Sequence, residues 1–231
     1  IIATPIGNIQ DTTLRTIKTL GTVDILLVED TRTFDSFYKN IQELFHLTPE
    51  KKQMIIHFHK ENEFEKLTSV LSLLKEGKTV GLVSESGMPL ISDPGSLLLK
   101  HVIKEKIPYT VIPGPTAFVN AVVLSGYSTE HILFLGFLPK KKSHILQLFN
   151  KLKTTNEILN EITIVFYESP YRIYETLKTI NDVFPESEIC ICREMTKKFE
   201  EIIRGTAKEL MHKSYKGEIT IGYVLDLAVR H

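Results

Sequence analysis

The chain has 231 residues, of which 42% are hydrophobic, and its 28 lysines and arginines match its 28 aspartates and glutamates in number. This composition is that of an ordinary globular protein with one large or two medium domains, and we expect two. Because the charges balance, the protein has no overall basic field to attract nucleic acid, so such a contact has to come from local patches. No apolar stretch approaches the length of a membrane-spanning helix, which excludes such a helix.

The first half of the chain alternates short aliphatic runs with segments of helical periodicity. Ile1-Ile2-Ala3 has the character of the end of a strand, so we expect a few residues before it, and nothing visible resembles a signal peptide. Further strands are predicted at 25–28, 80–83 and 109–112, and helices at 11–20, 64–74 and 96–104. Strands and helices that alternate at these distances form a parallel sheet covered by helices. We therefore predict a doubly wound α/β domain over residues 1–113.

The second half has a different order of elements. Pro113-Gly114-Pro115 interrupts both periodicities and marks the predicted hinge. Helices are predicted at 117–124, 145–152 and 173–180, and strands at 132–136, 162–167, 188–192, 199–204 and 219–225. The last strands follow one another closely, which favours antiparallel pairing. Residues 114–231 should therefore form a second α/β domain with a mixed sheet.

The two cysteines, Cys190 and Cys192, lie two residues apart in one of these apolar runs. On a strand they would share a face, and a disulfide between them would distort the strand. No other cysteine is available to complete a zinc site. We expect two buried thiols, no metal, and a reducing, cytoplasmic setting.

Five loops rich in Gly, Pro, Ser and acidic residues each follow an apolar run. They lie at residues 5–8, 29–32, 84–89, 113–117 and 168–172. If the runs are parallel strands, the loops leave the carboxyl ends of those strands, where open α/β sheets bind ligands. The loop at 84–89 is followed by Ser92-Asp93-Pro94-Gly95, and two turns of small residues leave backbone that a ligand can approach closely. The pattern indicates a binding site.

Each motif is weak when it is taken alone. Pro5-Ile6-Gly7-Asn8 has neither the GxGxxG spacing nor the lysine of a phosphate loop. Glu29-Asp30-Thr31-Arg32 gathers two carboxylates, a hydroxyl and a guanidinium, but a helix N-cap at Asp30 or Thr31 beside a solvated arginine fits as well. His57 and His59 lack a matching cluster of His or Cys residues, so we favour a structural role over a metal site.

Eight motifs together, in chain order, resemble a known family. The motifs are 3–8 (ATPIGN), 29–32 (EDTR), 59–63 (HKENE), 82–95 (LVSESGMPLISDPG), 113–117 (PGPTA), 136–140 (GFLPK), 167–173 (YESPYRI) and 192–197 (CREMTK). They resemble the successive motifs of the ribosomal RNA small-subunit methyltransferase I family, which belongs to the tetrapyrrole methylase (class III methyltransferase) superfamily. The resemblance runs from residue 1 to about residue 225, nearly the whole chain.

The resemblance implies a two-domain class III α/β enzyme, usually a homodimer, that binds S-adenosylmethionine in the cleft between its domains. It further implies 2′-O-methylation of a cytidine ribose in the 16S ribosomal RNA of the small ribosomal subunit, without a metal or a membrane. The implied cofactor contacts are Pro5, Gly7, Ser84, Glu85, Ser86, Gly87, Met88, Ile91, Thr116, Ala117, Tyr167, Glu168, Thr220 and Ile221.

Methyl transfer to a ribose hydroxyl would be helped by a carboxylate that accepts its proton. We expect Asp30 first and Glu29 second in this role, with Asp93 behind them, and Arg32 and Arg172 as clamps for RNA phosphates. An ion pair that locks the loop is the alternative for Asp30 and Arg32. A local basic patch is formed by Lys140, Lys141 and Lys142, which would otherwise be an ordinary solvated loop.

The chain departs from the family pattern in the loop at 84–89, which reads SESGMP where the family usually has SDAGTP, and at Thr33 and Tyr171, which stand where the family carries histidine. The second hypothesis is a methyltransferase that acts on a small tetrapyrrole such as a precorrin, the other large activity of the superfamily. The third is a module that binds S-adenosylmethionine or RNA and has lost catalysis along with the two histidines. The motifs at 29–32 and 167–172 resemble the RNA-modifying branch and favour the first hypothesis.

Overall fold

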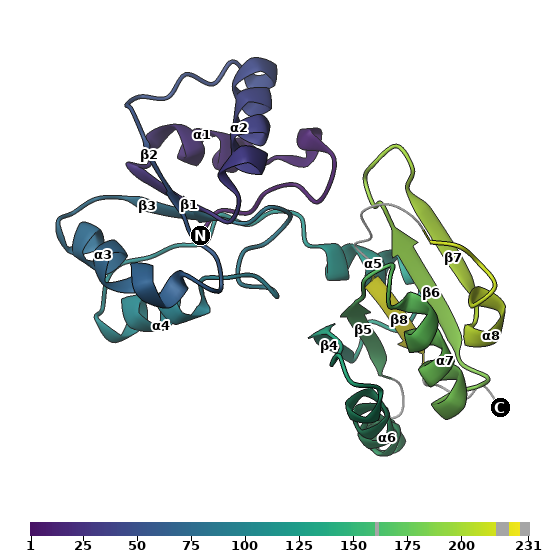
Figure 1. Cartoon of the computed structure of the whole chain (residues 1–231). Helices are drawn as coiled ribbons and strands as arrows, with labels where there is room; N and C mark the ends of the chain where they lie inside the picture. Colours follow the sequence, from purple (N-terminus) through teal and green to yellow (C-terminus); the bar gives the residue numbers. More distant parts are fainter. Residues whose placement is uncertain (160–161, 216–221, 227–231) are drawn as a thin grey trace. The chain divides into compact units, whose positions relative to one another are not determined.

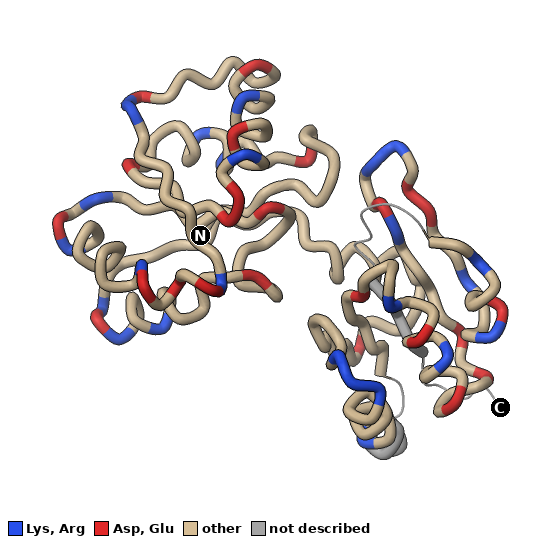
Figure 2. Tube along the Cα trace, in the orientation of Figure 1, with Lys and Arg blue, Asp and Glu red and all other residues tan. Residues whose placement is uncertain are grey.

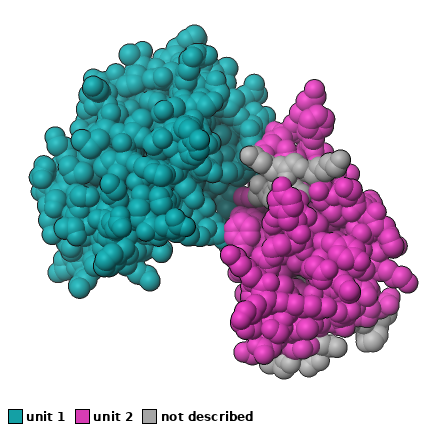
Figure 3. All heavy atoms as spheres, viewed as in Figure 1, with its two compact units in different colours: residues 1–116 teal, residues 117–231 magenta. Residues whose placement is uncertain are grey.

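The computed structural model describes residues 1–159, 162–215 and 222–226. The chain divides into two compact units, Ile1–Thr116 and Ala117–His231, which Figure 3 shows in two colours. This division comes three residues after the boundary expected at 113/114, just beyond the Pro113-Gly114-Pro115 segment. No helix in the described part of the chain is long and apolar enough to cross a membrane.

Unit 1 is built on a parallel sheet with the strand order β2-β1-β3 (Figure 1). Its strands are β1 (Ile25–Val28), β2 (Met54–His57) and β3 (Val80–Val83). All four residues of β1 are buried, as expected for a central parallel strand covered on both faces. Ile2 adds isolated parallel bridges to Val83 and Ile112 beside this sheet. The expected strand at 109–112 is thus reduced to one bridge, since Pro108 and Pro113 next to it lack the N–H group that ladders need.

Helices cover both faces of this sheet. The helices are α1 (Leu14–Thr22), α2 (Thr31–Phe45), α3 (Glu63–Lys75) and α4 (Ser96–Lys104). Ile25 and Leu27 pack with residues of α3 and α4, whereas Leu26 and Val28 pack with residues of α1 and α2 (Figure 1). Successive residues of a strand point to opposite faces, so this alternation gives the doubly wound arrangement that the sequence predicts.

Two elements of unit 1 are absent from the sequence prediction, and one begins later than predicted. Helix α2 begins at Thr31, inside the predicted loop at 29–32, and its apolar side chains Phe34, Tyr38 and Ile41 recur at helical spacing. Strand β2 has a run of only three apolar residues, Met54, Ile55 and Ile56, between polar neighbours, and in the fold it is largely exposed. Helix α1 begins at Leu14 because the Thr13 side chain, not Asp11 or Thr12, accepts the capping hydrogen bond from the N–H of Thr16.

Unit 2 contains a mixed five-stranded sheet with the order β4-β5-β8-β6-β7. The strands are β4 (Ile132–Phe137), β5 (Thr163–Tyr167), β6 (Glu188–Arg193), β7 (Glu201–Thr206) and β8 (Gly222–Asp226). Only the pair β4–β5 is parallel, and the other described pairs are antiparallel. The prediction of a mixed sheet is therefore confirmed.

The helices of unit 2 pack against its sheet. They are α5 (Ala117–Ser125), α6 (Lys142–Leu159), α7 (Ile173–Val183) and the short α8 (Ala207–Leu210). Phe149 of α6 and Leu177 of α7 pack on Ile164 and Phe166 of β5. Cys190 and Cys192 share a face of β6 as free, fully buried thiols whose sulfur atoms are 3.8 Å apart, as the sequence predicts.

Candidate functional site

Hydrogen bonds join the loop after Ala3 to the loop after β3. The backbone N–H of Thr4 donates to the carbonyl oxygen of Gly87 at 2.9 Å, and the Ser84 hydroxyl donates to the same oxygen at 2.9 Å. The Thr4 hydroxyl donates to the carbonyl of Ser84 at 3.2 Å, and the N–H of Gly87 donates to that of Pro5 at 3.3 Å. Because Thr4 and Ser84 are buried, these bonds fix the two loops side by side.

Gly87 is also the point where a third loop approaches. Its φ is +81°, and a Cβ atom added there would lie 3.1 Å from Cγ2 of Ile6 and 3.3 Å from the carbonyl oxygen of Pro115. The loops at 5–8, 84–89 and 113–117 therefore meet at Gly87. Any larger residue there would push its side chain into Ile6 and the Pro115 carbonyl. Beyond it, Glu85 and Ser86 are exposed, and Met88 and Ile91 are half-buried.

The segment 84–95 holds an unusual backbone. Gly87 and Gly95 have positive φ angles, and so do the non-glycine residues Leu90 (+72°) and Ser92 (+71°). Left-handed backbone is uncommon for such residues and persists only where the surroundings enforce it, which occurs often at ligand sites. A buried carboxylate anchors the far end of the segment: Oε1 of Glu63 accepts from the N–H groups of Leu97 and Leu98 in the first turn of α4.

A fourth loop lines a small pocket at the carboxyl ends of β1 and β3. The residues around this pocket are Val28, Glu29, Asp30, Thr33, Phe34, Phe37, Val83, Ser84 and Glu85. Four of the five loops singled out from the sequence thus belong to unit 1, at the carboxyl edge of its parallel sheet, which is the arrangement that the strand order predicts.

Asp30 is tied to its own helix. Its side chain caps α2 by accepting from the N–H of Arg32 at 2.8 Å, and the Arg32 guanidinium donates to both carboxylate oxygens at 3.2 and 2.7 Å. These hydrogen bonds from Arg32 hold the pKa of Asp30 well below its usual range. A carboxylate stabilised in this way is a weak proton acceptor, so the geometry favours the cap and ion pair over the base that the sequence analysis expected first.

Asp93 behaves in the opposite way. Burial, together with the negative charges of Glu29 and Glu85, raises the pKa of its carboxyl to about 7, although the positive charge of Lys60 lowers it in part. Lys60 is held nearby, since its Nζ donates to the carbonyl oxygen of Ser92 at 2.7 Å. Asp93 is therefore an acid of the strand-end loops whose charge changes near neutral pH.

The motif at 59–63 serves structure. Oδ1 of Asn62 accepts from the N–H of His59 at 2.8 Å, and Nδ2 donates to the carbonyl oxygen of His57 at 3.0 Å. The rings of His57 and His59 are 4.6 Å apart. Within residues 1–159, 162–215 and 222–226, no group of three or more His, Cys, Asp or Glu side chains is placed to hold a metal ion.

Unit 2 places Tyr167 in an aromatic cluster that the sequence analysis did not identify. The Tyr167 hydroxyl accepts from the N–H of Phe118 at 3.3 Å, in the first turn of α5. The ring centroids of Phe134 and Phe137 lie 5.1 and 5.5 Å from that of Tyr167, and Phe118 stacks on Phe134 at 4.3 Å. The cluster joins the end of β5 to β4 and to the start of α5, where Ala117 is buried.

The remaining predicted residues fall into three groups. Glu168 is buried and bound within unit 2, and Arg172 donates to backbone carbonyls of the same unit. Lys140, Lys141 and Lys142 are exposed and form an unbroken basic run that ends at the first residue of α6 (Figure 2). Thr220 and Ile221 lie outside the described residues.

A larger hollow of about 730 Å³ opens elsewhere in unit 1, around Val80, Leu98 and the segment 107–112. None of the described residues that line it carries a carboxyl or imidazole group, and most are apolar. Its charged side chains are the lysines Lys51 and Lys78, which are protonated at neutral pH. Because proton transfer needs an acceptor group, which the strand-end loops supply in Glu29 and Asp93, we assign the functional site to those loops.

Comparisons with known proteins show the family of the chain. Residues 1–211 match the family model of Tetrapyrrole (Corrin/Porphyrin) Methylases. The chain is 39% identical to Ribosomal RNA small subunit methyltransferase I of Thermotoga maritima, over 96% of this chain and 95% of that protein. It is 38% identical to the protein of the same name from Halalkalibacterium halodurans, over 96% of this chain and 73% of that protein.

Two solved structures share the fold. The methyltransferase CobJ superposes with a TM-score of 0.66 at 16% identity, over 98% of this chain and 93% of that one. The cobalt precorrin-4 methyltransferase CbiF gives the same TM-score and identity, over 100% of this chain and 95% of that one. The predicted class III fold is thereby confirmed.

The first testable prediction concerns the pKa of Asp93. A carboxyl whose folded-state pKa lies above its ordinary value of 3.8 binds its proton more tightly in the folded protein, so stability is lost as the pH rises from about 4 to about 7. Asp93→Asn, which stays neutral, should therefore raise the free energy of unfolding relative to the wild type more at pH 8 than at pH 5. Urea denaturation at both pH values measures this, with the exposed Asp35→Asn as control. An equal difference at both pH values would contradict the raised pKa.

The second prediction separates strain from contact at Gly87. Gly77 has nearly the same φ, +82°, but an added Cβ there meets nothing within 4 Å. Gly77→Ala should cost about 1 kcal/mol of unfolding free energy from the left-handed backbone alone. Gly87→Ala should cost more, because its methyl group also contacts Ile6 and the Pro115 carbonyl. Denaturant titrations measure both costs, and equal losses would show that the three loops do not close around Gly87.

Proposed function

The chain belongs to the tetrapyrrole methylase family and, within it, to the ribosomal RNA small subunit methyltransferase I family, and from this premise we propose that it methylates the 2′-hydroxyl of a cytidine ribose in 16S ribosomal RNA with S-adenosylmethionine as the methyl donor. The observation that carries the proposal is the identity of 35–39% over most of the chain with relatives of that name. Identity to the tetrapyrrole methyltransferases of known structure is only 16%, which supports the fold alone.

The strand-end loops of unit 1 fit a cofactor that is held through backbone groups. We propose Pro5, Gly7 and residues 84–88 with Ile91 as contacts, because their backbone is cross-linked and closely packed at Gly87. Thr116 follows in the third of these loops, and its hydroxyl donates to the Gly114 carbonyl at 3.4 Å. When bound, S-adenosylmethionine supplies a methyl group that its sulfonium charge already activates. The protein then has to bind the cofactor and the RNA, orient the ribose hydroxyl towards the methyl group, and exclude water from both.

In unit 2, we propose Ala117 and Tyr167 as further contacts, supported by the aromatic cluster at the start of α5. Glu168 fits a supporting role better, because its carboxylate already accepts from Ser169 and Thr176. Its contribution would be to hold the backbone of the loop at 168–172 in place.

Proton removal from a ribose hydroxyl needs an acceptor that is free to bind the proton. Because Arg32 occupies both oxygens of Asp30, we propose that Asp30 and Arg32 fix the start of α2. Glu29, which lines the pocket, is one proposed acceptor. Asp93 is the other, because its pKa of about 7 is close to the working pH, where a base works best.

The third prediction tests transfer directly. The wild-type protein, tritiated S-adenosylmethionine and small ribosomal subunits that lack the modification should give label in 16S ribosomal RNA, at a nucleotide that resists alkaline cleavage. Gly87→Ala should lose most of this activity through weaker cofactor binding. Gly77→Ala, which carries the same backbone strain away from the site, should retain it.

Three other results would contradict the proposal in different ways. Label in a precorrin-type tetrapyrrole instead of RNA would favour the tetrapyrrole hypothesis. Calorimetric binding of S-adenosylmethionine without transfer to RNA or tetrapyrrole would indicate a binding module. Equal activity of both glycine variants would remove the assignment of the cofactor to the loops around Gly87.

A further inference from the structure

The Arg172 guanidinium faces the backbone of a neighbouring loop. Both of its terminal nitrogens donate to the carbonyl oxygen of Leu138 at 3.3 Å, and Nη2 also donates to that of Pro139 at 2.6 Å. A planar guanidinium with several fixed donors suits two successive carbonyls, which a lysine ammonium reaches less well. The two carbonyls belong to the residues directly before Lys140.

A buried carboxylate holds Arg172 from the other side. Nη1 of Arg172 lies 3.4 Å from Oε1 of Glu168, whose side chain is 0% exposed. Glu168 also accepts from the N–H of Ser169 at 2.9 Å and from the Thr176 hydroxyl at 2.7 Å. A buried carboxylate such as that of Glu168 needs an opposite charge beside it, so it holds the guanidinium of Arg172 in place.

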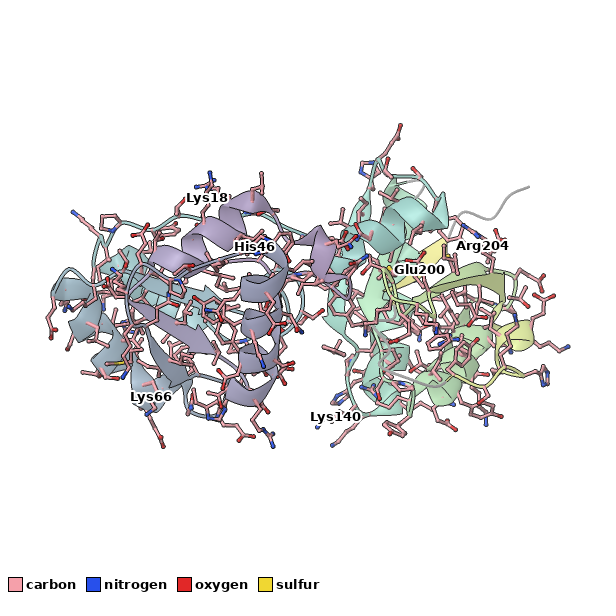
Figure 4. The ribbon with its side chains drawn as sticks, turned by 90° about the horizontal axis from the view of Figure 1, so that it is seen from above. Lys18, His46, Lys66, Lys140, Glu200 and Arg204 are labelled. Atoms are coloured by element: carbon pink, nitrogen blue, oxygen red, sulfur yellow. The ribbon has the colours of Figure 1, made fainter. Side chains whose placement is uncertain are left out.

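The other end of the basic run is also attached to α7. Nζ of Lys142 lies 3.3 Å from Oδ2 of Asp182, which belongs to α7. Residues 138–142 are therefore held at both ends, by Arg172, the N-cap of α7, at Leu138 and Pro139, and by Asp182 of α7 at Lys142. Between these attachments Lys140 and Lys141 are exposed, and the side chain of Lys140 extends from the loop ahead of α6 (Figure 4).

We propose that Arg172 is a positioning residue for RNA binding, which holds the backbone at Leu138 and Pro139 so that Lys140 and Lys141 present a fixed pair of charges to phosphates. Arg172 itself makes no phosphate contact. The inference rests on the proposed function, because RNA is the polyanion involved. Fixing the loop before binding lowers the ordering cost that two flexible lysines on a free loop would carry.

The decisive variant is Arg172→Lys, because it keeps the positive charge and loses the planar donors. Binding of unmodified small ribosomal subunits is measured between 50 and 200 mM salt for four proteins: the wild type, Arg172→Lys, the pair Lys140→Gln and Lys141→Gln, and the triple variant. The lysine pair should weaken binding roughly tenfold and reduce the salt slope by about 1.5, the effect of two lost phosphate contacts. Arg172→Lys should weaken binding severalfold in the wild type and have no further effect when both lysines are already replaced.

Two readouts separate this role from a merely structural one. The Michaelis constant for the subunits should rise in Arg172→Lys while the rate at saturation stays unchanged. Lys178→Gln, an exposed change on α7 outside this network, should leave both unchanged. If Arg172→Lys does not fold, the variant Glu168→Gln with Arg172→Gln removes both charges of the pair and takes its place in the cycle.

Additive effects of Arg172→Lys and the lysine changes would overturn the inference, because they would mean that Arg172 contacts RNA itself. Unchanged binding by Arg172→Lys would also overturn it. In both cases the wild type still binds and methylates RNA, so the proposed function stands. A wild type that neither binds nor methylates the subunits would overturn both together.

Discussion

The carbonyl oxygen of Gly87 is the junction on which the candidate site of unit 1 depends. It accepts hydrogen bonds from the backbone of Thr4 and from the hydroxyl of Ser84, and the missing side chain at Gly87 lets Ile6 and Pro115 approach. These contacts convert separate turns at the ends of parallel strands into one cross-linked set of loops. A ligand that binds there meets a backbone that is already ordered, which lowers the ordering cost of binding.

The fold was predictable where the local pattern and the burial agree. Strand β1 is a run of four aliphatic residues that is buried on both faces, and its sequence predicts both facts. Strand β2 is an exposed edge strand and gave no such signal. The run at 109–112 resembles a strand, but flanking prolines limit it to one bridge at Ile112. Local composition predicts what a segment favours, whereas pairing depends on its neighbours.

The site was predictable at the level of loops and less so at the level of single groups. Parallel strands bring their carboxyl ends to one edge, so grouping of the loops of unit 1 follows from strand order. The roles of Asp30 and Arg172 depend on their partners. Asp30 caps α2 and pairs with Arg32, whereas Arg172 donates to carbonyls that lie more than thirty residues away in sequence. The raised pKa of Asp93 depends on burial, on Glu85 of its own segment, and on the charges of Glu29 and Lys60 from two other segments. The sequence alone does not show which groups the fold brings next to these side chains.

We propose that the cofactor binds at the cross-linked loops around Gly87 and not in the larger hollow around Val80. Amide hydrogen exchange with and without S-adenosylhomocysteine, the demethylated product, distinguishes these two places. We expect slower exchange in peptides that cover residues 4–8 and 84–95, and unchanged exchange in peptides that cover 74–82 and 107–111. Protection confined to the second group of peptides, or to neither group, would contradict it.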